Sequence, residues 1–209
     1  MPQRQNPTKR TRAPGDRARA RITEEAAELA TIEGLDGLTI GRLADATGVP
    51  KSSVHALFGS KEELQLATIT AARDSFITEV VTPALEAAEP GRNRLLALCE
   101  GYLSYVERRV FPGGCFFVAA SAEFGGRPGR VHDEVAHVQQ QWRDLLEAEA
   151  RAAKQRDQLP DGTDPKQLAF ELGVILAGTN VVSVLHDDAG AIARARAAVG
   201  TRLTEAGAD

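Results

Sequence analysis

Apolar residues recur at every third or fourth position along nearly the whole chain, and strict alternation of apolar and polar residues is scarce. The residues that carry this pattern are mainly Ala, Leu, Glu, Arg and Gln, which favour helices. Ile22, Ala26, Leu29 and Ala30 form the first apolar stripe, and Gly34 can end that helix in a left-handed conformation. The pattern predicts an all-α protein of about nine helices.

Two short helices are predicted at 39–46 and 50–58. Thr39 stands at the N-cap position of the first, and Gly48 breaks the chain between them. Pro50 suits the first position of the second helix, because the N–H group that it lacks has no partner there. Two short helices joined by a tight turn are thus expected directly after the first helix.

A longer helix is predicted next, since Ser60 and Glu63 have the spacing of a capping box, and it is expected to end at or near Pro83. Residues 115–124 are ambiguous, because 115–118 also fits a short buried strand. A helix is favoured there because alanines follow and no partner strand is found. Proline and glycine clusters separate the other helices, which are expected at about 93–109, 131–158, 165–186 and 191–205.

The composition is that of an ordinary globular protein, since 43% of the 209 residues are hydrophobic and 26% are charged. This balance excludes wholesale disorder. No apolar run approaches the roughly 20 residues of a membrane-spanning helix, because charged residues interrupt each one. Cys99 and Cys115 are far apart, and no secretory signal follows the N-terminal arginines, so a soluble protein of the reducing cytoplasm is expected.

The formal net charge of −4 hides an asymmetry along the chain. Residues 1–61 contain about ten Lys and Arg against about seven Asp and Glu, roughly +3, which leaves roughly −7 for the rest. Residues 1–16 mix proline and glycine with basic side chains and are predicted to form a flexible basic arm. The basic end that binds a partner is therefore expected to be the N-terminal one.

The two short helices and the helix before them fit a helix-turn-helix inside a three-helix bundle. Such a motif lays its second helix in the major groove of DNA, with an apolar side anchored in the protein and a polar side turned outward. In 50–58 the apolar side is Val54 and Phe58, and the polar side is Lys51, Ser52, Ser53 and His55.

Residues 37–68, GLTIGRLADATGVPKSSVHALFGSKEELQLAT, resemble the DNA-binding segment of the TetR family of transcriptional regulators. The diagnostic pattern covers 17–68, about a quarter of the chain. The remainder is similar more loosely, through the segments GGCFFVAASAEF and QLAFELGVILAGTN. The residues that fill the family's characteristic positions are Gly34, Thr39, Gly48, Phe58 and Lys61.

The resemblance implies a homodimeric repressor that binds a palindromic operator and is released by a small-molecule effector. It places a helix-turn-helix domain at 17–63 and a helical effector-binding and dimerisation domain at 64–209. Coupling between the two is expected through 61–81, which is rooted in the bundle and lines the expected cavity. The alternative is a constitutive DNA-binding or architectural dimer with no small-molecule ligand.

The candidate DNA contacts combine the polar side of 50–58 with basic residues around it. Lysine pairs with the acceptors of guanine, and Lys61 opposes the macrodipole at a helix N-terminus, which favours a phosphate contact over a structural role. The family usually has Tyr in place of His55 and often His in place of Leu57, so a thinner set of phosphate contacts is expected. A merely solvated side chain is the alternative for each. The candidates are Arg17, Arg19, Thr39, Arg42, Lys51, Ser52, Ser53, His55 and Lys61.

Small residues such as Gly173 and Gly178 stand among the apolar residues of the last two predicted helices, 165–186 and 191–205. Small side chains let helices approach closely, so these helices from two chains can form a four-helix interface. An ordinary core within one chain is the alternative at each position. The prediction is a homodimer through the last two helices.

Aromatic residues gather on the predicted helices of the acidic part, where they can line an apolar cavity with a few polar groups. Such a cavity suits a drug-sized or acyl-type molecule, whose identity the sequence does not disclose. Core packing is the alternative for each single aromatic. The candidate lining residues are Phe76, Tyr102, Tyr105, Phe116, Phe117, Glu123, Phe124, His137, Trp142, Phe170 and Asn180.

Catalytic, metal and cofactor sites are not predicted. His132 and His137 lie about 140° apart around a helix and do not make a metal-binding pair. Cys99 and Cys115 lack a CxxC spacing, and the sequence contains no Walker A, GxGxxG or GxSxG motif. The chain is therefore predicted not to be an enzyme.

Overall fold

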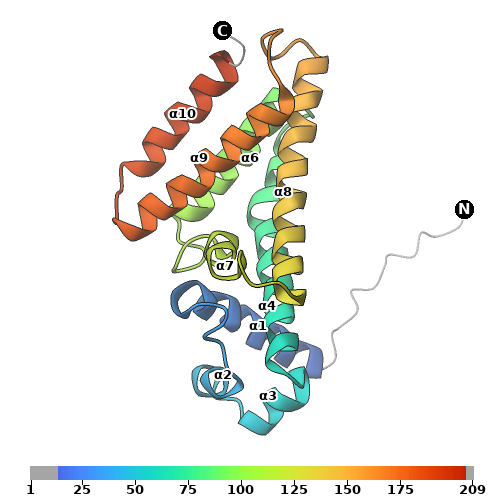
Figure 1. Ribbon diagram of the computed structural model, residues 1–209, viewed down its shortest axis with the longest axis vertical. Helices are drawn as coiled ribbons and strands as arrows, with labels where there is room; N and C mark the ends of the chain where they lie inside the picture. Colours follow the sequence, from blue (N-terminus) through green and yellow to red (C-terminus); the bar gives the residue numbers. More distant parts are fainter. Residues whose placement is uncertain (1–13, 206–209) are drawn as a thin grey trace, which may run out of the picture.

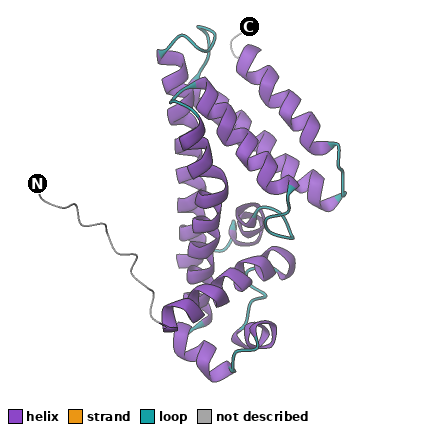
Figure 2. Cartoon of the chain, turned by 180° about the vertical axis from the view of Figure 1, so that it is seen from behind, coloured by secondary structure: helices purple, strands orange, loops and turns teal. Residues whose placement is uncertain are grey.

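The computed structural model describes residues 14–205, which fold into helices joined by short loops, with no strand in this part of the chain (Figure 1, Figure 2). When the continuous helical stretch that begins at Lys61 is counted once, these residues contain nine helices, as predicted. Most of the predicted arm, 1–16, lies outside the described residues. Its last three residues form the first turn of α1 (Pro14–Glu33) instead, because proline is compatible with the first helical position.

One end of the molecule is a small bundle of α1, α2 (Ile40–Thr47), α3 (Lys51–Phe58) and the beginning of α4 (Lys61–Phe76) (Figure 1). Helices as short as α2 and α3 are marginal alone in water, so their stability depends on packing against the bundle. The three-and-four spacing of the sequence supplies that packing through the buried side chains Ile22, Leu38, Leu43, Val54, Phe58 and Leu64.

The ends of the short helices lie where the sequence predicts them. Thr39 Oγ1 accepts a hydrogen bond from the backbone N–H of Arg42 at 3.0 Å, and Ser60 Oγ accepts one from that of Glu63 at 3.1 Å. Gly48 has a φ of 67°, in the left-handed region that favours glycine. These contacts fix the turn between α2 and α3 and the start of α4.

The expected end of the fourth helix at Pro83 is wrong. At Ile77, α4 passes into a π-helical segment, η1 (Ile77–Val81), and the chain continues as α5 (Thr82–Ala87) with Pro83 in its first turn. The N–H of Thr82 bonds to the carbonyl of Ile77, five residues back. Proline in a regular α-helix clashes with the carbonyl four residues before it, and the wider π turn accommodates this without ending the helix.

Five helices form the larger end of the molecule, and each begins and ends within three residues of its predicted bounds: α6 (Arg92–Glu107), α7 (Phe116–Phe124), α8 (Arg130–Gln155), α9 (Pro165–Leu185) and α10 (Ala191–Glu205). The ambiguous segment 115–124 is helical. In Figure 1, α4 and α8 run side by side, and α9 crosses them with α10 outside. α7 lies between the two ends of the molecule and contacts both α1 and α8.

Helix α9 departs from the sequence expectation about apolar runs. Within the described residues it is the one helix long and apolar enough to cross a membrane, with a mean hydropathy of 1.9, and only 39% of that stretch is buried. Its outward face carries a row of exposed apolar side chains at helical spacing: Phe170, Val174, Val181, Val182 and Leu185. This face is therefore apolar without being covered by the rest of its own chain.

Candidate DNA-binding surface and ligand cavity

Helix α3 presents one apolar and one polar side, as predicted. Val54 is 0% and Phe58 is 5% exposed, and both pack into the core of the bundle. The polar side chains on the other side are all exposed: Lys51, Ser52, Ser53 and His55. Because Val54 and Phe58 anchor the helix in the core, its exposed polar residues are held in a fixed orientation.

Arg19 of α1 braces α3. Its Nη1 donates a hydrogen bond to the carbonyl oxygen of Leu57, and its guanidinium lies 4.6 Å from the centre of the Phe58 ring. Of the two arginines proposed on α1, Arg17 is exposed and Arg19 is partly buried against α3. The Arg19 side chain thus contacts α3 within the protein and is only partly exposed.

Two other basic candidates also have partners within the chain. Arg42 pairs with Glu33, with Nη2 and Oε1 2.6 Å apart. Lys61 Nζ lies 2.8 Å from Asp36 Oδ1 and also donates to the Asp36 carbonyl oxygen. Lys61 opposes the macrodipole at the N-terminus of α4, and the Asp36 carboxylate offsets this position.

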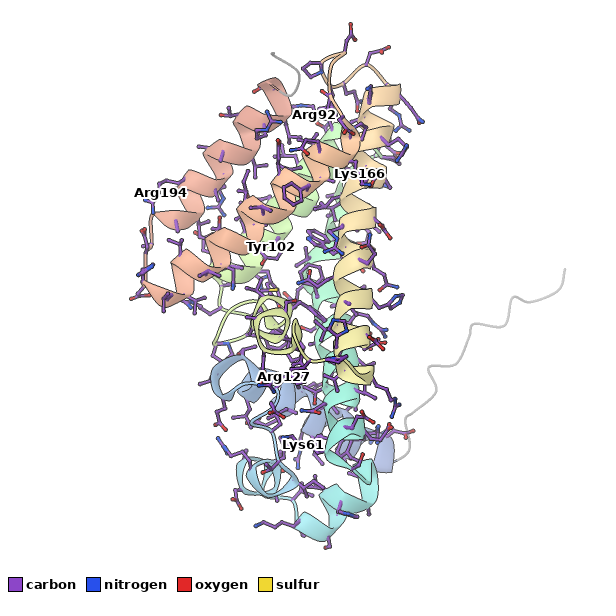
Figure 3. The ribbon with its side chains drawn as sticks, in the orientation of Figure 1. Lys61, Arg92, Tyr102, Arg127, Lys166 and Arg194 are labelled. Atoms are coloured by element: carbon purple, nitrogen blue, oxygen red, sulfur yellow. The ribbon has the colours of Figure 1, made fainter. Side chains whose placement is uncertain are left out.

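Asp36 receives a second cation from the larger end of the molecule. Arg127, labelled in Figure 3, lies in the loop between α7 and α8, and its Nη1 is 3.0 Å from Asp36 Oδ2. The hydrogen bonds from Lys61 and Arg127 lower the pKa of the Asp36 carboxyl below its ordinary value. Asp36 thus ties the loop between α1 and α2 both to α4 and to the larger end.

A carboxylate of α7 holds the same loop. Glu123 Oε2 accepts a hydrogen bond from the backbone N–H of Leu35 at 2.8 Å, and Oε1 accepts one from that of Asp36 at 2.7 Å. Gln65 of α4 donates from its amide to the Leu35 carbonyl oxygen at 3.1 Å. Both ends of the molecule are therefore joined through this loop by directional polar contacts.

The larger end contains a partly open cavity of about 190 Å³. α4 and η1 form one wall, and α6, α7, α8 and α9 form the others. Tyr102, near the middle of this end in Figure 3, is one of its lining residues. Four of the predicted ligand-binding residues share this wall: Phe76, Tyr102, Phe117 and Trp142.

Three of these rings form one aromatic cluster. The Phe76 ring meets the Trp142 ring edge-on, with centroids 5.2 Å apart, and the Tyr102 ring is nearly parallel to Trp142 at 6.2 Å. Tyr102 is 4% exposed, and its hydroxyl has no oxygen or nitrogen hydrogen-bond partner among the described residues. Leaving a buried hydroxyl unpaired costs about 1–3 kcal/mol. Burial, together with the neighbouring Cys115 thiol, raises the pKa of Tyr102 well above its ordinary value.

The polar part of the wall, which is Arg73, Gln139 and Gln141, was not predicted from the sequence. Helical spacing alone could have located two of them, because Arg73 precedes Phe76 by three residues and Gln139 precedes Trp142 by three. The Gln139 amide donates to the Phe117 carbonyl oxygen at 3.2 Å. Among the described residues that line this cavity there is no Asp or Glu.

A second, more open depression of about 390 Å³ adjoins the cavity. It shares Gln139, Trp142, Gly173 and Ala177 with the first, and two further predicted residues, Phe124 and Phe170, line it.

Five residues proposed as ligand contacts lie away from both hollows. Tyr105 and Phe116 are 1% exposed and belong to the core, and His137 is on the exposed side of α8. Asn180 accepts the backbone N–H of Cys115 at 2.7 Å and so anchors the start of α7. Glu123 is engaged with the loop between α1 and α2. Residue type suggested these five, but their orientation on the helices separates them from the cavity.

No group of three or more His, Cys, Asp or Glu that could hold a metal ion is found among the described residues. Cys99 and Cys115 are free and buried. Burial raises the pKa of Cys99 to about 12 and raises that of Cys115, so both are held as thiols.

Comparisons with known proteins agree with these observations. The family described as bacterial regulatory proteins, tetR family, matches residues 22–68, and the family described as tetracyclin repressor-like, C-terminal domain, matches residues 91–199. The second span alone is more than half of the chain. A search among curated proteins finds no match.

Several solved structures have the same fold. A TetR transcriptional regulator from Chloroflexus aurantiacus superposes with a TM-score of 0.83 at 23% identity, over 90% of this chain and 95% of that one. A transcriptional regulator from Saccharomonospora viridis, in complex with choline, gives 0.72 at 21% identity, over 90% and 96%. AibR, in complex with isovaleryl coenzyme A and operator DNA, gives 0.68 at 20% identity, over 88% and 96%. With its helix-turn-helix, its larger helical end and both family matches, the chain belongs to the TetR family of DNA-binding transcriptional regulators.

Proposed function

We propose that this regulator binds a palindromic operator as a homodimer and that a small molecule in the cavity releases it. The observation that carries the DNA-binding half is the exposed polar side of α3, held outward by buried Val54 and Phe58. A helix anchored in this way can enter a major groove without rearrangement. It follows that the reading residues are those of α3, with the other basic residues in supporting roles.

The proposed DNA contacts differ in how readily they are made. The polar residues of α3 are exposed and can contact DNA without giving up an ion pair: Lys51, Ser52, Ser53 and His55. Thr39 keeps its capping hydrogen bond and is exposed at the start of α2. Arg42 and Lys61 reach a phosphate only by giving up Glu33 and Asp36, so they are proposed as secondary contacts. Arg19 is proposed to act by positioning α3, and Arg17 to meet the DNA backbone.

The exposed apolar face of α9 supports a homodimer through α9 and α10. Val174 is 54% and Leu185 is 73% exposed, and a second copy would remove this face from water. A dimer of this kind accounts for the hydropathy of α9 without a membrane. The regulator would then act in the cytoplasm, where operator DNA is found.

Release by a ligand needs a route from the cavity to α3. Arg73 and Phe76 on α4 line the cavity, and the π-helical segment continues the same wall. α7 gives a second route, because Phe117 lines the cavity and Glu123 holds the loop before α2. A neighbour of the same fold was solved with both a small molecule and operator DNA, which supports a fold that accommodates the two.

The test is a fluorescence anisotropy titration with promoter DNA from the regulator's own genomic neighbourhood. We expect binding far tighter than to shuffled DNA of the same length and loss of this difference in the double variant Lys51→Ala, Ser53→Ala. The variant Lys166→Ala, at the far end of the molecule, is the matched control and should bind as the wild type does (Figure 3). Equal affinity for promoter and shuffled DNA would rule the proposal out.

The boundary between the two predicted domains, at residues 63 and 64, stays a prediction. α4 spans this boundary without a break, from Lys61 to Phe76. The two domains are thus proposed as functional units that share one helix.

A further inference from the structure

The cavity wall has few polar groups, and its charged side chain is positive. Arg73 is the charged side chain on the wall, and Gln139 and Gln141 are the amides. Arg73 bonds to Asp74 Oδ1 at 3.0 Å, but the Asp74 side chain is 63% exposed and does not line the cavity. An organic cation would therefore enter next to a guanidinium and find no carboxylate on the described wall.

The Tyr102 hydroxyl is the second observation that constrains a ligand. Tyr102 lines the cavity, and its buried hydroxyl has no oxygen or nitrogen partner among the described residues, although buried hydroxyls are usually paired. The neighbouring Cys115 thiol is only a weak hydrogen-bonding group and does not replace an oxygen or nitrogen partner. A ligand oxygen that reaches the hydroxyl would supply the missing oxygen partner, and a ligand without such an atom would leave the hydroxyl with the Cys115 thiol alone.

The size and shape of the cavity limit the apolar part of the ligand. A cavity of about 150 Å³ is known to accept one benzene ring, and this cavity is about 190 Å³. Phe76, Tyr102 and Trp142 present ring surfaces to it, and aromatic ligands pack well on such surfaces. One ring with a short substituent fits, and a longer group would continue into the adjoining depression, past Gly173 and Ala177.

We propose that the effector, given the proposed regulatory function, is a small aromatic molecule that is uncharged or anionic and bears an oxygen that accepts a hydrogen bond from Tyr102. Arg73 favours the anionic forms, and the absence of a carboxylate from the described wall disfavours cations. Tyr102 is thus the residue that distinguishes an oxygen-bearing ring from a hydrocarbon of the same shape.

The chain has one tryptophan, Trp142, and it lies on the cavity wall, so its fluorescence reports occupancy directly. Four probes of similar size separate the effects of charge and of the oxygen: benzoate, acetophenone, ethylbenzene and phenyltrimethylammonium. We expect benzoate and acetophenone to change the Trp142 emission at lower concentrations than ethylbenzene does, and phenyltrimethylammonium to bind most weakly. Binding of phenyltrimethylammonium as tight as that of benzoate would overturn the proposal, as would no response to any probe.

The variant Tyr102→Phe removes the hydroxyl and keeps the ring. We expect this variant to bind acetophenone and benzoate about tenfold more weakly, which corresponds to the loss of one hydrogen bond. Its affinity for ethylbenzene should be unchanged. Tyr105→Phe, on the same helix but away from the cavity, is the matched control and should change nothing. The same weakening in both variants, or in neither, would contradict the role of Tyr102.

A further variant, Arg73→Gln, should bind benzoate more weakly and acetophenone with unchanged affinity. Promoter binding measured on the same protein keeps this inference separate from the proposed function. Selective aromatic binding without promoter binding would leave the inference standing and reject the function. Promoter binding together with a fluorescence response that favours the cation would support the DNA-binding function and reject the inference about the ligand.

Discussion

The Glu123 carboxylate caps the backbone N–H of Leu35 at 2.8 Å, from a helix 88 residues further along the chain. Glu123 lies at the end of α7, whose beginning lines the cavity, and Leu35 lies in the loop that leads into α2. The contact joins the two ends of the regulator on one of the two routes proposed for a ligand signal. A change in the position of α7 would act on α2 and α3 through this loop.

Replacing Glu123 with alanine should loosen that loop. Two charge-assisted hydrogen bonds are removed from a partly buried site, so we expect the free energy of unfolding to fall by about 1–2 kcal/mol. Hydrogen exchange should show faster exchange of the Leu35 and Asp36 amides. Glu134→Ala on α8 is the control, and equal exchange in the wild type and Glu123→Ala would contradict the proposed link.

Asp36 gives the same junction a dependence on pH. Its carboxyl pKa is lowered by Lys61 and Arg127, so the ionised form stabilises the folded state above the ordinary carboxyl pKa of about 3.9. This contribution disappears as the pH falls through the lowered pKa of the folded state. The side chain is 46% exposed, so the effect should stay below about 1 kcal/mol.

Denaturant unfolding of the wild type and of Asp36→Asn measures this effect. The wild type should be the more stable at pH 7 and at pH 5, and the difference should disappear below the folded-state pKa. A difference that grows on acidification would have the wrong sign for the proposed ion pairs.

Arg19 and Arg17 should behave differently although both are basic residues of α1. Arg19→Ala removes the hydrogen bond to Leu57 and the contact with the Phe58 ring, so we expect a decrease of about 1–2 kcal/mol in stability. Arg17→Ala should leave the melting temperature unchanged and act on DNA affinity alone. Thermal denaturation of both variants is the measurement. Equal melting temperatures for Arg19→Ala and Arg17→Ala would contradict the proposal that Arg19 stabilises the packing of α3.

The exposed face of α9 should carry the dimer. We expect Val174→Arg and Val181→Arg to convert the protein to monomers, because a charge in an apolar interface is left without a partner. Sedimentation equilibrium measures this as a fall from twice the mass of one chain to the mass of one. Ala148→Arg, on the exposed side of α8, should remain dimeric. A wild type that is already monomeric would contradict the proposed interface.

Much of the fold could be predicted because helix bounds depend on local chemistry. Gly48, Thr39 and Ser60 act within three residues of themselves, and the structure confirms each of them. The π-helical segment before Pro83 could not be predicted, since proline usually ends a helix and its accommodation by a π turn is the rarer outcome.

The candidate site was predicted less completely than the fold. The outward side of α3 follows from helical spacing, whereas the partners of Lys61 and Arg19 come from other helices or loops and leave no mark in the sequence. In the same way, residue type alone placed Asn180 in the cavity, although its side chain holds the start of α7. Interactions between distant segments are what the sequence could not supply.

A footprint of the regulator on its promoter DNA would show whether α3 is the reading helix. If α3 of each protomer enters a major groove, protection should cover two inverted half-sites whose centres are about one helical turn, or a whole number of turns, apart. Lys51→Ala should weaken protection, and if Lys51 meets a phosphate, the slope of log K against log salt concentration should become shallower by about one. Protection that is unchanged by Lys51→Ala, or that shows no paired half-sites, would contradict the assignment of α3 as the reading helix.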